Sequence, residues 1–263
     1  MDKKYTIEDL LKIMERLRQP DGCPWDKVQT HESIKKSLIE ESYEAIDALD
    51  SKDDKAFANE LGDVLLQVVF HSQIAKERGA FDFDDVVNEI STKLVTMHTY
   101  VFGKEHAGNE DEALTYWEAN KKKEKGLKTY SDMLNDVPHY YPALMRAEKV
   151  QKKAKGAGFD WDNIDDVYAK VYEEIDELKQ AQAEGNKAHI EEEYGDLLFA
   201  AVNLGRFLGV TPETALADAS NKFVKRFEKM EQEAVKENKD LAQMSLEEMD
   251  EIWNRIKHCS GQD

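Results

Sequence analysis

Glutamates and aspartates recur in a fixed pattern at two places in this 263-residue chain. The first copy has Glu-Glu-x-x-Glu at residues 40–44 and Glu-x-x-Asp at residues 60–63, with fifteen residues between the motifs. The second copy repeats both motifs and their spacing at residues 173–177 and 193–196, 133 positions later. A constant offset over four acids indicates an internal duplication, so the sequence predicts two homologous domains.

Carboxylates at this spacing can converge on one ion. Residues three or four apart share a helix face, so Glu174 and Glu177 project together, as do Glu193 and Asp196. Fifteen residues are enough to end one helix, turn and begin an antiparallel neighbour. Because facing carboxylates repel, a cation is expected between them, and their oxygens favour Mg²⁺, Mn²⁺ or Ca²⁺. The same positions in the first copy could also bind a metal: Glu41, Glu44, Glu60 and Asp63.

Other metal or phosphate sites fit the sequence less well. A ferritin-like di-iron bundle needs Glu-x-x-His motifs, and none of the seven histidines has a glutamate three residues earlier. The sequence also has no EF-hand loop and no GxxxxGK[ST] phosphate loop. An acidic metal site without a phosphate loop is what remains.

The elements that carry these acids are predicted to be helices. The chain has only five prolines, helix-forming residues dominate, and alternating β-branched runs are scarce. We therefore predict an all-α fold of two tandem domains with four-helix-bundle packing. A charged run, KKKEKG, followed by Pro138 and Pro142 suggests a connector between the domains. The predicted division is a first domain at 1–125, a linker at 126–140 and a second domain at 141–263. Helices are expected at 82–101, 171–183, 190–208 and 212–235, the last capped by Thr211 with Pro212 as its first residue.

Charge and composition exclude several classes of protein. The formal net charge of −19 opposes nonspecific nucleic-acid binding, which depends on cationic side chains. No run of about 18 apolar residues is present to span a membrane, and the N-terminus has no signal-peptide core. Cys23 and Cys259 form no disulfide framework or zinc pattern. These features indicate a soluble cytoplasmic protein without a nucleic-acid or membrane partner.

Three further sequence motifs, taken together with the duplicated acids, indicate a resemblance to a known family. GCPWDKVQT at 22–30, VFG at 101–103 and NKFVKRF at 221–227 accompany them. Over nearly its whole length the chain resembles the MazG family of bacterial nucleoside triphosphate pyrophosphohydrolases. That resemblance implies an all-α fold, usually a homodimer, with helices packed around Mg²⁺. It also implies cleavage of nucleoside triphosphates to the monophosphate and pyrophosphate; related all-α families act on dUTP and on phosphoribosyl-ATP.

The resemblance also implies roles for individual residues. Lys222 and Arg226 would hold the triphosphate, and Trp253 would close the site against the nucleotide. Glu173 and Glu192 adjoin the metal ligands and are candidates to orient or deprotonate the attacking water. The metal ligands themselves would be Glu174, Glu177, Glu193 and Asp196.

The second half is predicted to be the catalytic one, and the first half to be structural, weakly active or differently specific. If Lys93 is placed against Lys222, the first half has Met97 where the second has Arg226. The offset of 133 also places Phe70 opposite Asn203, a polar side chain that could meet the substrate.

We expect ATP-binding and Mg²⁺-dependent hydrolysis of many NTPs and dNTPs, because recognition would centre on the phosphates; Mn²⁺ is a possible substitute. One alternative is a narrow-specificity pyrophosphatase for dUTP, a phosphoribosyl nucleotide or a modified NTP. Another is a non-catalytic helical scaffold or regulator stabilised by Mg²⁺. A homodimer is expected because the apolar faces at 60–75 and 193–208 exceed what one small unit buries; pairing of the two halves within one chain is the alternative. The number of ions, the phosphorus attacked, the base and sugar preference, and any protein partners leave no mark in the sequence.

Overall fold

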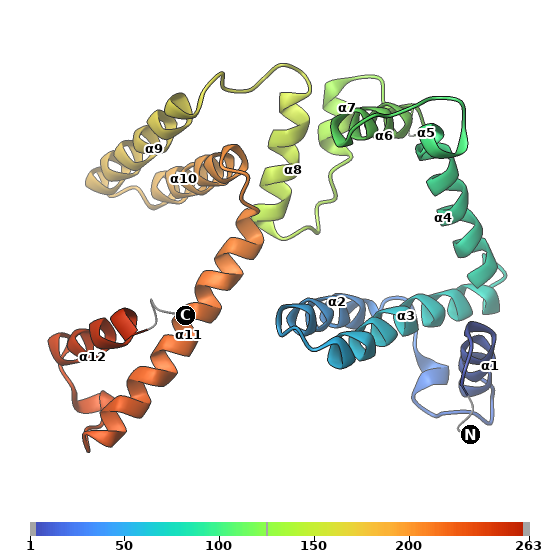
Figure 1. Ribbon diagram of the computed structural model, residues 1–263, viewed down its shortest axis with the longest axis horizontal. Coiled ribbons are helices and arrows are strands. Elements are labelled where there is room, and N and C mark those ends of the chain that lie inside the picture. The colour runs from blue at the N-terminus through green and yellow to red at the C-terminus, as the bar shows by residue number, and fades with distance from the viewer. Residues whose placement is uncertain (1–3, 125, 260–263) are drawn as a thin grey trace. The chain divides into compact units, whose positions relative to one another are not determined.

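The computed structural model describes residues 4–124 and 126–259, and all regular secondary structure in these ranges is helical (Figure 1). The chain divides into two compact units, Met1–Lys121 and Lys122–Asp263. The all-α fold is therefore confirmed. The first unit contains α1 (Ile7–Leu17), η1 (Asp26–Val28), α2 (Lys35–Asp50), α3 (Asp54–Glu77), α4 (Phe83–Met97), α5 (Thr99–Phe102) and most of α6 (Glu110–Glu124). The second contains α7 (Tyr130–Asn135), α8 (Ala143–Lys155), α9 (Ile164–Glu184), α10 (Lys187–Phe207), α11 (Pro212–Lys236), η2 (Leu241–Gln243) and α12 (Leu246–Cys259).

In the first unit, α2 and α3 form a helical hairpin, and α1 packs against α3 (Figure 1). Asp53 caps α3, its carboxylate accepting hydrogen bonds from the backbone N–H groups of Lys55 and Ala56, each at 3.0 Å. An apolar cluster joins α1 to α3 and to the segment before α2. Its buried members are Met14, Ile34, Val69, Phe70 and Ile74.

The second unit repeats this arrangement, with α9 and α10 as the hairpin and α8 packed against α10. The turn between the hairpin helices uses Gly185, whose φ of +70° disfavours other residues, and Asn186, which caps α10. Helices α11 and α12 make a further hairpin around a second apolar cluster. Its buried members are Met230, Ala234, Ile252 and Ile256.

The helix bounds correct two predictions. Helix α9 begins at Ile164 rather than at 171, because Asn163 caps it there. The helix expected at 82–101 ends at Met97, because His98 takes φ −101° and ψ 54° and the chain restarts as the short α5. Asp82 caps its beginning, and Thr211 and Pro212 occupy the predicted cap and first position of α11. The stretch proposed as a linker, 126–140, includes α7.

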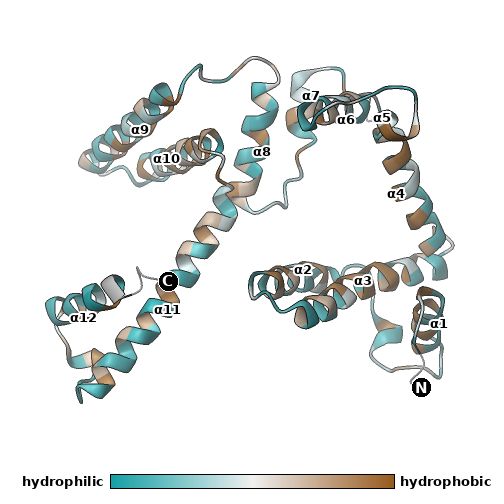
Figure 2. Cartoon of the chain, in the orientation of Figure 1, coloured by the Kyte–Doolittle hydropathy of each residue, from teal (hydrophilic) through white to brown (hydrophobic). Residues whose placement is uncertain are grey.

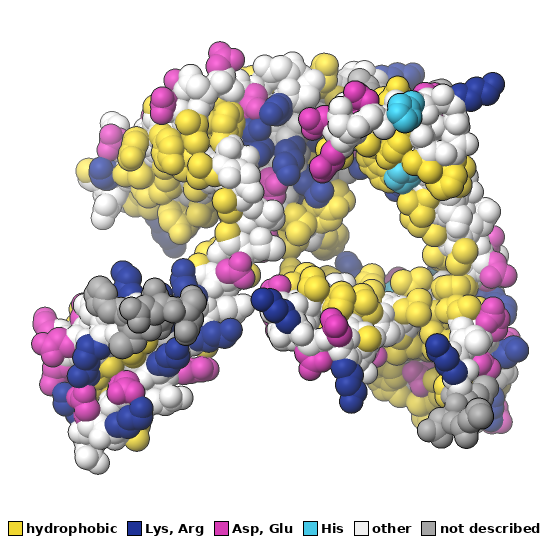
Figure 3. Space-filling model, viewed as in Figure 1, with side chains coloured by type: hydrophobic (Ala, Val, Ile, Leu, Met, Phe, Trp, Pro, Cys, Tyr) yellow, Lys and Arg dark blue, Asp and Glu magenta, His cyan; other side chains and the backbone are white. Residues whose placement is uncertain are grey.

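Large apolar side chains remain exposed on both hairpins. Figure 2 shows hydrophobic residues along α2 and α3 and along α9 and α10, and Figure 3 shows such side chains gathered on their surfaces. Leu61 is 47% exposed on α3, whereas Val69 on the same helix is fully buried. One unit therefore covers only part of the wide apolar face of α3. Within the described ranges no helix has the length and apolarity to span a membrane.

Candidate active site

The predicted acids of the second half do meet. Glu174 and Glu177 on α9 and Glu193 on α10 each bring one carboxylate oxygen within 4.8 Å of the other two. Glu174 is buried, with 4% of its surface exposed. Desolvation and the negative charge of Glu174 raise the pKa of Glu177. Three mutually repelling carboxylates at this spacing are a donor set of the kind that a hard divalent cation neutralises.

Two basic side chains, Lys170 and His189, lie beside this cluster. Each is one helical turn from one of the clustered acids. Lys170 on α9 places its Nζ 2.7 Å from Glu174 Oε1 and 2.9 Å from Glu173 Oε1. These hydrogen bonds, that to Glu174 first, raise the pKa of Lys170 and keep it charged. His189 on α10 places Nε2 3.0 Å from Glu193 Oε1, and its hydrogen bond to Glu184 is the main cause of its raised pKa.

The acids of the first half form a matching cluster. Glu41 and Glu44 on α2 and Glu60 on α3 also bring carboxylate oxygens within 4.8 Å of one another. Desolvation and then the charge of Asp63 raise the pKa of Glu41, so the fourth acid also acts on this cluster. Both halves therefore carry carboxylates that could hold a metal ion.

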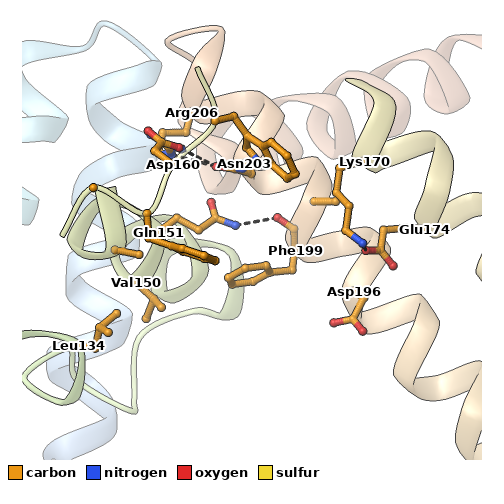
Figure 4. Close-up of a pocket in the computed structure, with 15 residues that line it drawn as sticks. Leu134, Val150, Gln151, Asp160, Lys170, Glu174, Asp196, Phe199, Asn203 and Arg206 are labelled. Carbon is orange, nitrogen blue, oxygen red and sulfur yellow. Dashed lines mark hydrogen bonds and ion pairs between the residues drawn. The ribbon is translucent and has the colours of Figure 1, made fainter. Parts of the chain in front are cut away.

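A cavity of about 710 Å³ adjoins the acids of the second half (Figure 4). Glu174, Asp196 and Lys170 line it at the side of the acidic cluster. Asp196, although outside the group of three mutually close carboxylates, thus lies where the acids meet the cavity. The other walls come from α7, α8, α10 and the loop before α9, and they are mainly aromatic, aliphatic and amide side chains. They include Phe159, Trp161, Phe199, Gln151 and Asn203. The volume is that of a typical small-molecule site.

An ion pair fixes the loop that carries two of these aromatic rings. Asp160 lies between Phe159 and Trp161, and its carboxylate binds the Arg206 guanidinium, with Nη1 3.0 Å from Oδ2 (Figure 4). The side chain of Arg206 is 7% exposed and that of Asp160 15%. Burial raises the pKa of Asp160, but the hydrogen bonds from Arg206 and the Trp161 backbone outweigh it, and the net shift is downward. The loop is therefore tied to α10, the helix that carries Glu193 and Asp196.

The other residues implicated by sequence lie at different places. Asn203 lines the cavity. Lys222 is exposed and Arg226 half-buried on α11, and neither lines the cavity. Trp253 on α12 packs against Phe223, with ring centroids 5.2 Å apart, and is also outside the lining. Glu173 binds Lys170, as described, and Glu192 is exposed on α10 next to Glu193.

Comparison with known proteins assigns the chain to a family. The model of the MazG nucleotide pyrophosphohydrolase domain matches residues 29–102, and the model of phosphoribosyl-ATP pyrophosphohydrolase matches residues 143–223. The chain is 48% identical over 251 residues to a Thermotoga maritima protein named nucleoside triphosphate pyrophosphohydrolase/pyrophosphatase MazG, covering 95% of each. The chain belongs to the MazG family.

Two further relatives place the family in other bacteria. An Escherichia coli K12 protein named nucleoside triphosphate pyrophosphohydrolase is 46% identical over 254 residues, which are 95% of this chain and 97% of that protein. The Bacillus subtilis protein YabN, called uncharacterized, is also 46% identical over 254 residues, but these are 96% of this chain and only 52% of YabN. The two matching domain models also confirm the tandem helical architecture that the repeated acids predict.

Several residues at this site are not among those predicted from the sequence. Lys170 and His189 each lie four positions before an acid, and that i, i+4 spacing is a signal the sequence already contains. Gln151, Asp160 and Arg206 come from three separate segments, and no spacing rule connects them.

Proposed function

We propose that the second half hydrolyses nucleoside triphosphates to the monophosphate and pyrophosphate, with Mg²⁺ held by Glu174, Glu177, Glu193 and Asp196. One observation supports this most strongly: a cavity large enough for a nucleoside is lined by Glu174, a member of the carboxylate cluster, and by Asp196. The relatives from T. maritima and E. coli carry the name of this activity.

The donor set suits the ion. All four side chains offer carboxylate oxygens, which Mg²⁺ prefers, and three of them already stand close enough to share one ion. When bound, Mg²⁺ would neutralise phosphate charge and lower the pKa of a coordinated water. Mn²⁺, which takes the same ligands, is expected to substitute.

The chain's own residues would orient the substrate and the water. If water adds to the α-phosphorus, the bond from that phosphorus to the oxygen that bridges to the β-phosphorus breaks and pyrophosphate is the leaving group. If water adds to the β-phosphorus, the bond from that phosphorus to the same oxygen breaks and the nucleoside monophosphate is the leaving group. Both routes give the same two products, and the water gives up a proton. Lys170, fixed beside Glu174 at the mouth of the cavity, is placed to meet a phosphate oxygen. Glu173 and Glu192 remain the candidates to orient or deprotonate the water. Phe159, Trp161 and Phe199 offer apolar rings to the nucleoside.

We further propose that two copies of this chain form the working enzyme. Large apolar side chains are exposed on the same hairpins that carry the acids, including Leu61 at 47% and Tyr194 at 54%. A second hairpin packed on these faces would complete a four-helix bundle. The predicted phosphate ligands Lys222 and Arg226 stand outside the cavity of their own unit, and a second copy is a way to bring them to it.

Product analysis tests the activity. The purified chain is incubated with each NTP and dNTP, with and without Mg²⁺, and monophosphate and pyrophosphate are quantified. Pyrophosphate from many of the nucleotides, dependent on the ion, is the expected result. Cleavage of a single nucleotide would contradict the broad specificity, and release of no pyrophosphate from any of them would contradict the activity.

Light scattering and subunit mixing test the dimer. We expect twice the mass of one chain. Glu177→Ala and Arg226→Ala chains, each inactive alone, should regain about one quarter of wild-type activity after random mixing, since half the dimers would hold one intact site. The mass of a single chain would contradict the proposed dimer. Mixtures that stay inactive would show that Arg226 acts within its own chain.

A further inference from the structure

Two side-chain amides, Gln151 on α8 and Asn203 on α10, line the same cavity (Figure 4). Gln151 is 6% exposed, and its Nε2 donates to the backbone carbonyl of Phe199 at 2.8 Å. Because a carbonyl only accepts hydrogen bonds, this contact fixes which end of the amide is nitrogen. The oxygen, Oε1, is left buried without a hydrogen-bond partner. Buried acceptors are seldom left unpaired in native proteins, so a donor from a ligand is the expected partner.

The side-chain amide of Asn203 is oriented the other way: its oxygen is hydrogen-bonded within the protein and its nitrogen is left for a ligand. Its Oδ1 accepts from Arg206 twice, from Nε at 3.0 Å and from Nη2 at 2.7 Å, and Arg206 is itself bound to Asp160. With the oxygen used in this way, the Nδ2 hydrogens are what Asn203 can offer to a ligand. Asn203 follows Phe199 by one helical turn and shares its face of α10, and Gln151 reaches the same helix from α8 through its bond to the Phe199 carbonyl.

The lining of the cavity thus includes one fixed acceptor and one fixed donor, together with aromatic rings. Each common nucleobase carries the complement, an N–H beside a ring nitrogen or carbonyl: the amino group and ring nitrogen of adenine or cytosine, and the imino N–H and carbonyl of guanine or uracil. A base that stacks on the aromatic rings could therefore satisfy both amides whatever its identity.

We propose that Gln151 and Asn203 recognise the donor–acceptor edge that all common nucleobases share. Gln151 Oε1 accepts the N–H of the base, and Asn203 Nδ2 donates to the adjacent acceptor. This assignment rests on the proposed function of the second half. It gives a physical reason for tolerance among bases together with rejection of a base that has no N–H.

Purine riboside 5′-triphosphate tests the pair, because it is ATP without the amino group. We expect wild-type kcat/KM to favour ATP by about 10- to 100-fold, the range for a buried acceptor left unpaired. Gln151→Met should reduce that preference to within about threefold. Asn203→Ala should lower kcat/KM for both nucleotides by the same factor, since both keep the ring nitrogen.

Gln67→Met is the matched control. Gln67 is also 6% exposed with an unpartnered Oε1, but it lies on α3 in the first unit, and its replacement should leave the ratio unchanged. A wild-type ratio near one, or a ratio that survives Gln151→Met, would overturn the proposal. If Gln151→Met does not fold, Gln151→Leu replaces it, and the wild-type ratio and Asn203→Ala still decide. Calorimetric binding of the α,β-methylene analogues of the two nucleotides tests the same preference without turnover, so a chain that binds both analogues but cleaves neither nucleotide would refute the proposed function alone.

Discussion

The two halves of this chain carry the same cluster of carboxylates but differ in the space beside it. In the first half, Phe70 and Val69 of α3 pack with Met14 of α1 in a closed apolar core. In the second half, a cavity of about 710 Å³ lies among residues of α8 and α10, with Asn203 at the position that corresponds to Phe70. Acids in a fixed register bring carboxylates together in both halves, whereas a binding site for an organic ligand also needs polar groups and room.

Arginine is used differently in the two halves as well. Arg18 at the end of α1 binds Glu77 of α3 through Nε and Nη2, both at 2.8 Å, and its guanidinium lies 5.3 Å from the centre of the Phe70 ring. Arg206 instead binds Asp160 and Asn203 at the cavity. Arg18 packs over the apolar core of the first unit, whereas Arg206 holds two residues that line the candidate binding site.

The largest expected difference is in the response to losing one acid from either cluster. Glu177→Ala should reduce turnover by at least about 100-fold, because the carboxylates are proposed to hold an ion that would stabilise phosphate charge. Glu44→Ala, at the matching position of the first half, should retain most of the activity. Pyrophosphate release measures both, and the reverse pattern would make the first half catalytic.

Filling the cavity of the second half should make it resemble the first. Asn203→Phe is expected to lower kcat/KM by roughly 10- to 100-fold through loss of a hydrogen bond and of space for the nucleoside. Circular dichroism on the same variant checks that the helices remain. Unchanged kinetics in a folded variant would show that the nucleotide does not enter the cavity.

The reciprocal change should affect stability without affecting catalysis. Phe70 is 3% exposed, so Phe70→Ala should destabilise the first unit by about 3–5 kcal/mol, the usual cost of removing a buried phenyl ring. Denaturant unfolding followed in that unit measures the loss. A cost below about 1 kcal/mol would mean that the core around Phe70 is not closed.

The ion pairs Arg206–Asp160 and Arg18–Glu77 should differ in their effect on the kinetic constants. Asp160→Asn is expected to raise KM several-fold with kcat little changed, because the aromatic loop loses its tie to α10. Glu77→Gln is the counterpart in the first half and should leave both constants unchanged. Equal effects of the two variants on KM would contradict the role of Asp160 in positioning the aromatic loop.

The smallest effect is the pH dependence of the Arg18–Glu77 pair. Hydrogen bonding to Arg18 holds the pKa of Glu77 below its ordinary value, so its contribution is present at neutral pH and is lost as pH falls through the folded-state pKa. Since the Glu77 side chain is 37% exposed, we expect only about 1 kcal/mol. The difference in unfolding free energy between wild type and Glu77→Gln should shrink below about pH 4, and a difference that grows on acidification would contradict this sign.

The sequence predicts the parts of this structure that depend on local spacing. The register of Glu174, Glu177 and Glu193 was enough to predict the α9–α10 hairpin and the meeting of its acids. The break at His98 was missed because apolar periodicity continues through it up to Val101. The contacts of Gln151 and Asp160 with α10 depend on how α8 and the following loop fold back, which no local pattern encodes.

The central claim is that only the second half binds the nucleotide, and the number of binding sites tests it most directly. Calorimetric titration of the full chain with an α,β-methylene nucleoside triphosphate in Mg²⁺ reports that number without turnover. We predict one nucleotide per chain, lost in Asn203→Phe and retained in Phe70→Ala. Two nucleotides per chain, or one that persists in Asn203→Phe, would contradict the account.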